Sequence, residues 1–93
     1  MPKHIVVTGC SQGLGLALIQ GFIDSGHKVS GCSRNPLRMD ALQKEFGDQH
    51  YFEGVDVSKP DQVYAWANNC LGRQGPVDLI VNNAAIINPN ANM

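Results

Sequence analysis

Apolar residues follow two alternating patterns along this chain. Short unbroken runs of apolar or small residues alternate with longer segments in which apolar residues recur every three or four positions. A short unbroken run is typical of a strand buried on both faces, and the longer spacing is typical of an amphipathic helix. Strands are therefore expected at residues 5–7, 28–32, 51–55 and 77–81, and helices at 13–25, 36–46 and 58–71.

The residues at the helix ends support the first two helices. In the first helix Leu14, Leu18 and Phe22 recur at four-residue spacing, and Leu16, Ile19 and Ile23 widen this apolar stripe. Gly26 supplies a C-terminus. The second helix has Asn35-Pro36, an N-cap followed by proline at the first helical position, and Gly47 ends it.

The third helix is predicted to begin at residues 58–61, which resemble a capping box with Asp61 in place of the usual Glu or Gln. Gly72 and Gly75 are expected to end it. Four of its residues share one face at helical spacing: Val63, Trp66, Ala67 and Cys70.

Strands that alternate with helices through short connections pair in parallel, with right-handed crossovers between them. The predicted fold class is α/β, with about four strands and three helices. This is the N-terminal half of a Rossmann-like, doubly wound parallel sheet, a truncated three-layer α/β/α arrangement. Residues 1–93 are accordingly expected to form one partial NAD(P)-binding domain.

The composition of the chain argues against some classes of function. The chain has 93 residues, of which 43% are hydrophobic and 16% are charged, and this balance is typical of a globular protein. The net charge of −1 argues against a broad nucleic-acid or membrane surface, because both require a positive excess. No apolar run approaches the ~18 residues of a membrane span, and no signal-peptide core is found at the start.

The cysteines and histidines do not suggest a metal site. Cys10, Cys32 and Cys70 are odd in number and lack C-x-x-C spacing, so we expect reduced thiols in small buried sites of a cytoplasmic protein. The three histidines lie far apart and have no ligand-like partner in the sequence, so no metal is predicted.

Glycines cluster between the first strand and the first helix. The pattern is Thr8-Gly9-x-x-x-Gly13-x-Gly15, in which residues without Cβ allow a tight turn and a close ligand approach. Unpaired N–H groups at a helix start favour a phosphate. The alternative is a turn that only lets the helix pack, whereas a P-loop is excluded because no Gly-Lys-Ser/Thr follows.

With these residues the chain resembles the short-chain dehydrogenase/reductase family over essentially all 93 residues. The glycine motif of the family stands here as "TGCSQGLG", its adenine-side "DV" as Asp56-Val57, and its "NNAG" as Asn82-Asn83-Ala84-Ala85. Ala85 stands where the family usually has glycine, which puts only the nicotinamide side in doubt. The residues from Asn82 onward also resemble those of family members that act on pterin aldehydes.

The end of the second strand bears on the choice between NAD and NADP. An acidic residue there binds the ribose 2′-hydroxyl of NAD, and a cationic residue accommodates the 2′-phosphate of NADP. This strand ends Cys32-Ser33-Arg34-Asn35 with no acid nearby, so NADPH is predicted to be preferred over NADH. The alternative is that Arg34 is only a solvated surface residue.

The resemblance also implies roles for single residues. Asp56 would accept a hydrogen bond from the adenine amino group, or else would only be a cap near the start of the third helix. Asn82 would contact the nicotinamide ribose and Asn83 would tie strand four to its neighbours, or else both would be a polar strand end. The implied cofactor-binding residues are Gly9, Ser11, Gln12, Gly13, Leu14, Gly15, Ser33, Arg34, Asp56, Val57, Asn82 and Ala84, with Asn35 beside Ser33 and Arg34 at the 2′-phosphate.

Catalytic residues are not found. The family uses a tyrosine with a lysine four residues later and an upstream serine, but Val55 follows Tyr51 and Asn68 follows Tyr64 at that spacing. Tyr64 and Trp66 are expected to pack on a helix instead. We expect the N-terminal part of a longer reductase that acts on a carbonyl or alcohol and, by resemblance, forms homo-oligomers through later helices.

Two other hypotheses remain. A non-catalytic dinucleotide-binding module would explain the missing Tyr-x-x-x-Lys. Half of an extended-type epimerase or dehydratase is disfavoured, because the glycine spacing and "NNAA" match the short type.

Overall fold

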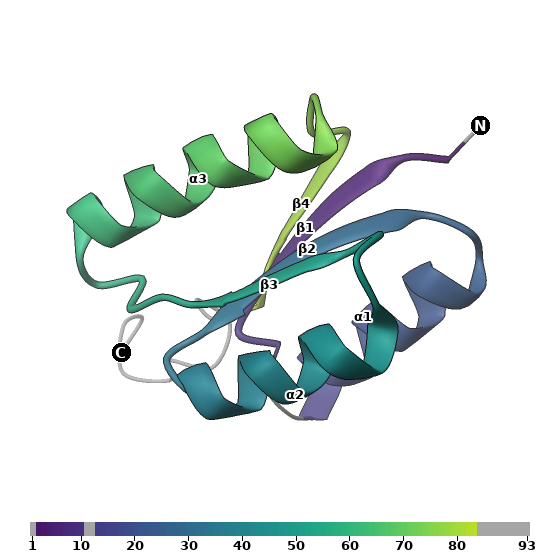
Figure 1. The fold of residues 1–93 in the computed structure, drawn as a ribbon, viewed down its shortest axis with the longest axis horizontal. Coiled ribbons are helices and arrows are strands. Elements are labelled where there is room, and N and C mark those ends of the chain that lie inside the picture. Colours follow the sequence, from purple (N-terminus) through teal and green to yellow (C-terminus); the bar gives the residue numbers. More distant parts are fainter. Residues whose placement is uncertain (1, 11–12, 84–93) are drawn as a thin grey trace, which may run out of the picture.

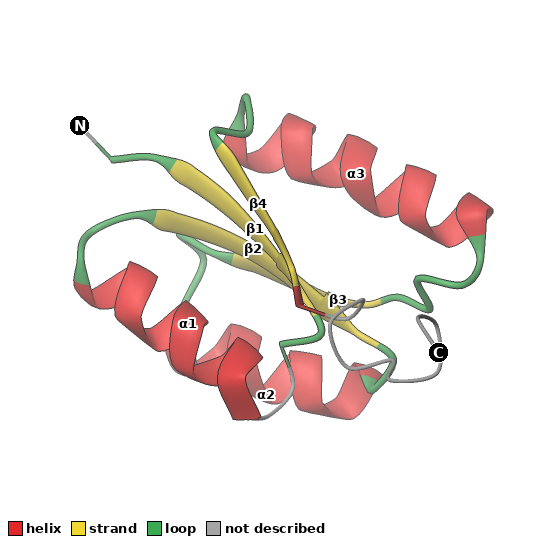
Figure 2. Cartoon of the chain, turned by 180° about the vertical axis from the view of Figure 1, so that it is seen from behind, coloured by secondary structure: helices red, strands yellow, loops and turns green. Residues whose placement is uncertain are grey.

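Four parallel strands form one sheet with helices on both faces (Figures 1 and 2). The computed structural model describes residues 2–10 and 13–83. The strands are β1 (His4–Thr8), β2 (Lys28–Ser33), β3 (Tyr51–Gly54) and β4 (Leu79–Asn82), and the helices are α1 (Gly13–Asp24), α2 (Pro36–Phe46) and α3 (Pro60–Gln74). The predicted α/β class, with these numbers of strands and helices in the described part, is confirmed.

The strand order is β3-β2-β1-β4. Figure 1 shows α1 and α2 on one face and α3 on the other, and each face has its own apolar core. The chain leaves β1 toward β2 through α1 but returns from β3 to the opposite side of β1 through α3. The carboxyl ends of β1 and β4 therefore form a topological switch point, where open α/β sheets bind ligands.

The ends of α2 agree with the prediction. The Asn35 side chain accepts a hydrogen bond from the Arg38 backbone N–H at 3.0 Å, and Pro36 occupies the first helical position. Gly47 ends the helix with φ +89°. These signals are local, which is why the sequence predicts them well.

Two predictions about α3 were wrong. Ser58 does not cap the helix, because Lys59 is the N-cap residue and no side-chain cap hydrogen bond is found there. The N–H and hydroxyl of Ser58 are instead bound to the Asp56 carboxylate. Gly72 lies inside α3, which ends only at Gly75.

The buried side of α1 agrees with the predicted stripe at Ile19, and Leu16, Phe22 and Ile23 pack partly buried against the core, but it differs at Leu14. Gly15 and Ile19 are its buried residues, whereas Leu14 is 60% exposed. Gly15 can come closest to the strand end because it has no side chain. On α3, Trp66 and Cys70 are buried as expected, and Tyr64 is on the surface.

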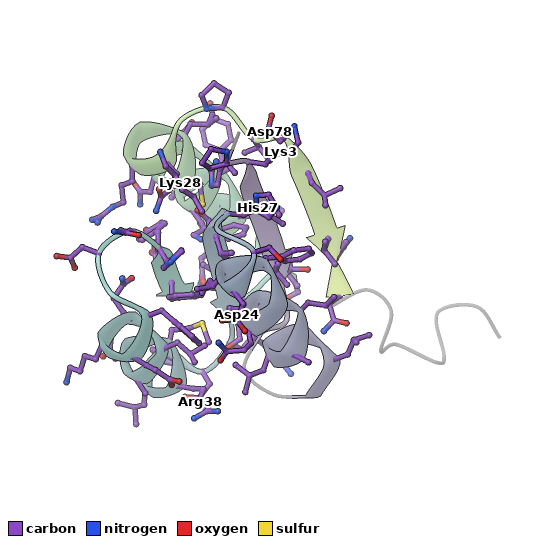
Figure 3. All side chains as sticks on the ribbon, turned by 90° about the vertical axis from the view of Figure 1, so that its right-hand side faces the viewer. Lys3, Asp24, His27, Lys28, Arg38 and Asp78 are labelled. Carbon is purple, nitrogen blue, oxygen red and sulfur yellow. The ribbon has the colours of Figure 1, made fainter. Side chains whose placement is uncertain are left out.

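The ionisable residues at the amino ends of the strands lie at the opposite end of the sheet from the glycine turn. Lys3, His27, Lys28 and Asp78 gather there (Figure 3). The Lys3 backbone N–H donates to His27 Nδ1 at 3.1 Å, and the His4 backbone N–H donates to Asp78 Oδ2 at 2.9 Å. These residues join β1, β2 and β4 and lie far from the switch point.

His50, just before β3, is buried, and its Nδ1 accepts a hydrogen bond from the Val29 backbone N–H at 3.1 Å. Burial lowers the pKa of His50 below 6.5. The unfolded chain therefore takes up this proton at a higher pH than the folded chain does. Stability from His50 is complete above pH 6.5 and is lost as pH falls through the folded pKa.

We predict that the free energy of unfolding decreases as pH falls below about 6.5 and that His50→Gln, which keeps an acceptor without titrating, reduces this decrease. Urea unfolding of both proteins at several values between pH 5 and 7.5 measures the difference. Identical pH dependence in the two proteins would show that His50 does not titrate on unfolding.

Candidate functional site

The glycine turn at the carboxyl end of β1 requires residues without side chains. Gly9 and Gly13 have φ +68° and +62°, in the left-handed region that other residues rarely adopt. The N–H groups of Gly9 and Cys10 both donate to the Cys32 carbonyl, at 2.9 and 3.2 Å. The start of the turn is therefore attached to the end of β2.

Gly15 permits the close approach of α1 to this turn. A Cβ at Gly15 would lie 2.2 Å from the Gly9 carbonyl oxygen and 2.9 Å from Asn83 Nδ2. Nothing larger than glycine fits without moving the backbone. The third glycine of the motif thus brings the helix start against the strand end.

Two asparagines join the end of β4 to this turn. Asn83 Nδ2 donates to the Gly9 carbonyl at 2.9 Å, which agrees with the structural role expected for Asn83. The Thr8 hydroxyl donates to Asn82 Oδ1, also at 2.9 Å. Side-chain hydrogen bonds therefore join the carboxyl end of β1 to the carboxyl end of β4 at the switch point.

The end of β2 presents one cation. Ser33 is buried, and its Oγ accepts a hydrogen bond from the Asn35 backbone N–H at 3.1 Å. The Ser33 carbonyl accepts from the Val55 N–H at 2.7 Å and so joins β2 to the residue after β3. Arg34 is exposed between these anchored neighbours.

Asp56 follows β3 at the same edge of the sheet. Its Oδ1 accepts hydrogen bonds from Ser58 N–H at 3.0 Å and from Ser58 Oγ at 2.7 Å. These bonds, together with the positive charges of Arg34 and Lys59, hold the pKa of Asp56 below 3.8. Asp56 binds Ser58 in the local turn and does not cap α3, whose N-cap residue is Lys59. Asp56 is also an anion close enough to Arg34 to interact with it.

The remaining predicted residues divide into two groups. Val57 is 44% exposed, as an apolar ligand surface requires, and Leu14 is exposed beside the glycine turn. Ser11, Gln12, Ala84 and Ala85 lie outside the described residues.

An apolar groove of about 410 Å³ lies between α3 and the sheet, with Thr8 and Asn82 among its lining residues. Trp66 and Ile80 also line it. The Trp66 indole N–H is buried and has no hydrogen-bond acceptor among the described residues. The groove offers apolar contacts and no charged side chain, so it does not suit phosphate groups.

The three thiols are not suited to nucleophilic chemistry. All are free and buried, as predicted. Burial raises the pKa of Cys10 and of Cys32 to about 12, and that of Cys70 to about 11. Thiols that stay protonated at neutral pH are poor nucleophiles.

Among the described residues, no group of three or more His, Cys, Asp or Glu side chains could hold a metal ion. No helix in that part of the chain is long and apolar enough to span a membrane.

Three residues of the site were missed by sequence reasoning. A Cβ at Gly31 would lie 2.8 Å from Cys10 Sγ, so Gly31 makes room for the turn. Ser58 could have been recognised from its spacing of two after Asp56, which is typical of an Asx turn. Gln62, whose Oε1 accepts from the Asp56 N–H at 2.9 Å, carries no such local signal.

Comparisons with known proteins agree with this geometry. The sequence model of a family described as "short chain dehydrogenase" matches residues 3–93. An NADPH-dependent pterin aldehyde reductase from Arabidopsis thaliana is 36% identical over 91 residues, which cover 96% of this chain and 38% of that protein. The chain thus spans well under half the length of this relative.

Solved structures also match. The actinorhodin polyketide ketoreductase, solved with NADPH, has a TM-score of 0.81 and 27% identity over 88% of this chain and 33% of its own. A 3-ketoacyl-(acyl-carrier-protein) reductase from Brucella melitensis, solved with NADH, has a TM-score of 0.79 and 28% identity over 84% of this chain and 32% of its own.

Gly15→Ala is predicted to lower the free energy of unfolding by about 1–3 kcal/mol or more, because the new Cβ would overlap the Gly9 carbonyl oxygen. Chemical denaturation measures the change. Gly21→Ala in the same helix is the matched control, since a Cβ there meets nothing within 4 Å. It should raise stability by about 0.5–1 kcal/mol. Equal effects of the two substitutions would contradict the close approach.

The thiols are predicted to resist Ellman's reagent at pH 8 in the folded chain and to react completely in denaturant, because they are buried and protonated. The absorbance of the released thiolate reports the reaction. Rapid reaction of Cys10 in the folded chain would contradict its placement under the glycine turn.

Proposed function

The chain belongs to the short-chain dehydrogenase family, and we propose that it is the cofactor-binding part of an oxidoreductase that uses NADP(H) to interconvert a carbonyl and an alcohol. The observation that carries this proposal is the glycine turn, with two left-handed glycines at the switch point and the start of α1 pressed against it. A longer side chain at these positions would fill the space that a pyrophosphate needs.

The described residues fit a dinucleotide. Backbone N–H groups at a helix start bind phosphate oxygens, and the glycines leave them accessible. Gly9, Ser11, Gln12, Gly13, Leu14 and Gly15 would line the pyrophosphate and its ribose. Asp56 and Val57 would hold adenine, and Asn82 and Ala84 would contact the nicotinamide ribose.

The preference for NADPH rests on the end of β2. Arg34 is exposed there, next to buried Ser33, and no acidic residue follows the strand. A guanidinium is well suited to the 2′-phosphate, whereas a carboxylate in its place would repel it. Similar proteins are described with NADPH and with NADH, so family membership leaves the preference open and Arg34 supports it.

The bound cofactor would supply a hydride to the carbonyl carbon. This chain's residues would bind and orient the cofactor, and the side-chain bonds of Thr8, Asn82 and Asn83 would hold the crevice in shape. A proton must also reach the carbonyl oxygen, but neither tyrosine here is followed by lysine at the family's spacing. We assign that step to no residue of this chain.

Because the chain is 36% identical in sequence to a pterin aldehyde reductase, heteroaromatic aldehydes are the first substrates to test. A cytoplasmic location and homo-oligomers stay predictions. The alternative function is a dinucleotide-binding module without catalysis.

We predict that the chain binds NADPH more tightly than NADH and that Arg34→Ala weakens NADPH binding by about tenfold or more, while NADH binding changes little. The reason is that only NADPH carries the 2′-phosphate. Isothermal titration with each cofactor measures both affinities.

Lys44→Ala removes the same charge from the last turn of α2, at the other end of that helix, and should leave the preference unchanged. Equal losses for both cofactors in Arg34→Ala would contradict the 2′-phosphate role. Failure of the unmodified chain to bind either cofactor would overturn the proposed function.

A further inference from the structure

Neighbouring residues form hydrogen bonds with every polar group of Asp56 except one carboxylate oxygen. Its backbone N–H donates to Gln62 Oε1 at 2.9 Å, and its carbonyl accepts from the Lys59 N–H at 2.9 Å. Its Oδ1 accepts twice from Ser58. Oδ2 accepts none of the hydrogen bonds found among the described residues.

We propose that Ser58 and Gln62 are positioning residues that orient the Asp56 carboxylate toward the cofactor's base and thereby select a purine with an exocyclic amino group. The inference rests on the proposed function, since it assumes that a dinucleotide occupies the switch-point crevice. It assigns to two further residues a role in base specificity.

The chemistry of the carboxylate determines which base fits. With Oδ1 taken by Ser58, only Oδ2 is left to meet a ligand. The bonds from Ser58 and the charges of Arg34 and Lys59 keep Asp56 ionised, so Oδ2 is an acceptor. At position 6, a 6-amino purine presents a donor to it, whereas a 6-oxo purine presents a carbonyl oxygen that the carboxylate repels.

The location agrees with this role. Val55, the residue before Asp56, donates its N–H to the carbonyl of Ser33, so Asp56 follows a backbone anchored to the end of β2. Val57, on its other side, is 44% exposed and offers an apolar contact for a ring. The acceptor, the apolar surface and Arg34 therefore belong to one edge of the sheet.

A purely structural role for Ser58 is disfavoured by the start of α3. Lys59 is the N-cap residue, and no side chain caps the helix. The Ser58 hydroxyl is directed to Asp56 and not to the N–H groups of the helix. Removing this hydroxyl takes no cap from the helix and leaves the Ser58 N–H as the donor to Oδ1, so the carboxylate is held less firmly.

The test compares NADPH with its reduced hypoxanthine analogue, in which an oxo group replaces the adenine amino group. The unmodified chain should bind NADPH about tenfold or more tightly than the analogue, as expected for a hydrogen bond to a charged acceptor. Ser58→Ala and Gln62→Ala should weaken NADPH binding severalfold and leave the analogue unchanged. Ser58→Thr, which keeps the hydroxyl, should retain the discrimination.

A measurement without ligand provides an independent readout. Carboxyl-carbon NMR should give a pKa for Asp56 below 3.8 in the unmodified chain and a higher pKa in Ser58→Ala, because one stabilising hydrogen bond is lost. Ser58→Thr should keep the low value.

The possible outcomes distinguish failure of this proposal from failure of the proposed function. Equal affinity of the unmodified chain for NADPH and the analogue overturns this proposal and leaves the proposed function standing. Equal weakening of both ligands by Ser58→Ala, or an unchanged Asp56 pKa, also overturns the proposal alone. Absence of any NADPH binding overturns the proposed function and this proposal with it.

Discussion

The contact between Gly15 and the Gly9 carbonyl is the constraint on which the candidate site depends. Backbone meets backbone there, because a Cβ at Gly15 would lie 2.2 Å from the carbonyl oxygen. The same oxygen accepts the Asn83 side-chain hydrogen bond, so α1, the end of β1 and the end of β4 converge on one atom. The start of α1 can lie against the end of β1 only if this convergence is kept.

Electrostatics divides the sheet into two edges. The carboxyl edge carries Arg34 and Asp56, whose charges stabilise one another, beside the uncharged glycine turn. The amino edge carries Lys3, His27, Lys28 and Asp78, which the figures place away from the switch point (Figure 3). A ligand with phosphates and an amino-substituted ring finds both a cation and an acceptor at the first edge.

Binding and chemistry are separable in this chain. In the proposed function the described residues would supply part of the phosphate turn, a cation for a 2′-phosphate and an oriented carboxylate, all of which would hold a cofactor in place. The buried thiols, with pKa values raised to about 11 or 12, and the exposed Tyr64 add no general acid or nucleophile. The roles proposed for the described residues are therefore roles in binding and choosing the cofactor.

Sequence alone determined the element types, the cap at Asn35 and the glycine turn, because periodicity, capping and left-handed glycines act over a few neighbouring residues. Only the tertiary structure decided that Gly15 and not Leu14 faces the sheet, and that Ser58 turns to Asp56 instead of capping α3. It also decided that Asn83 reaches Gly9, 74 residues away in sequence. Such contacts depend on where the sheet brings distant backbone groups, and no local pattern records that placement.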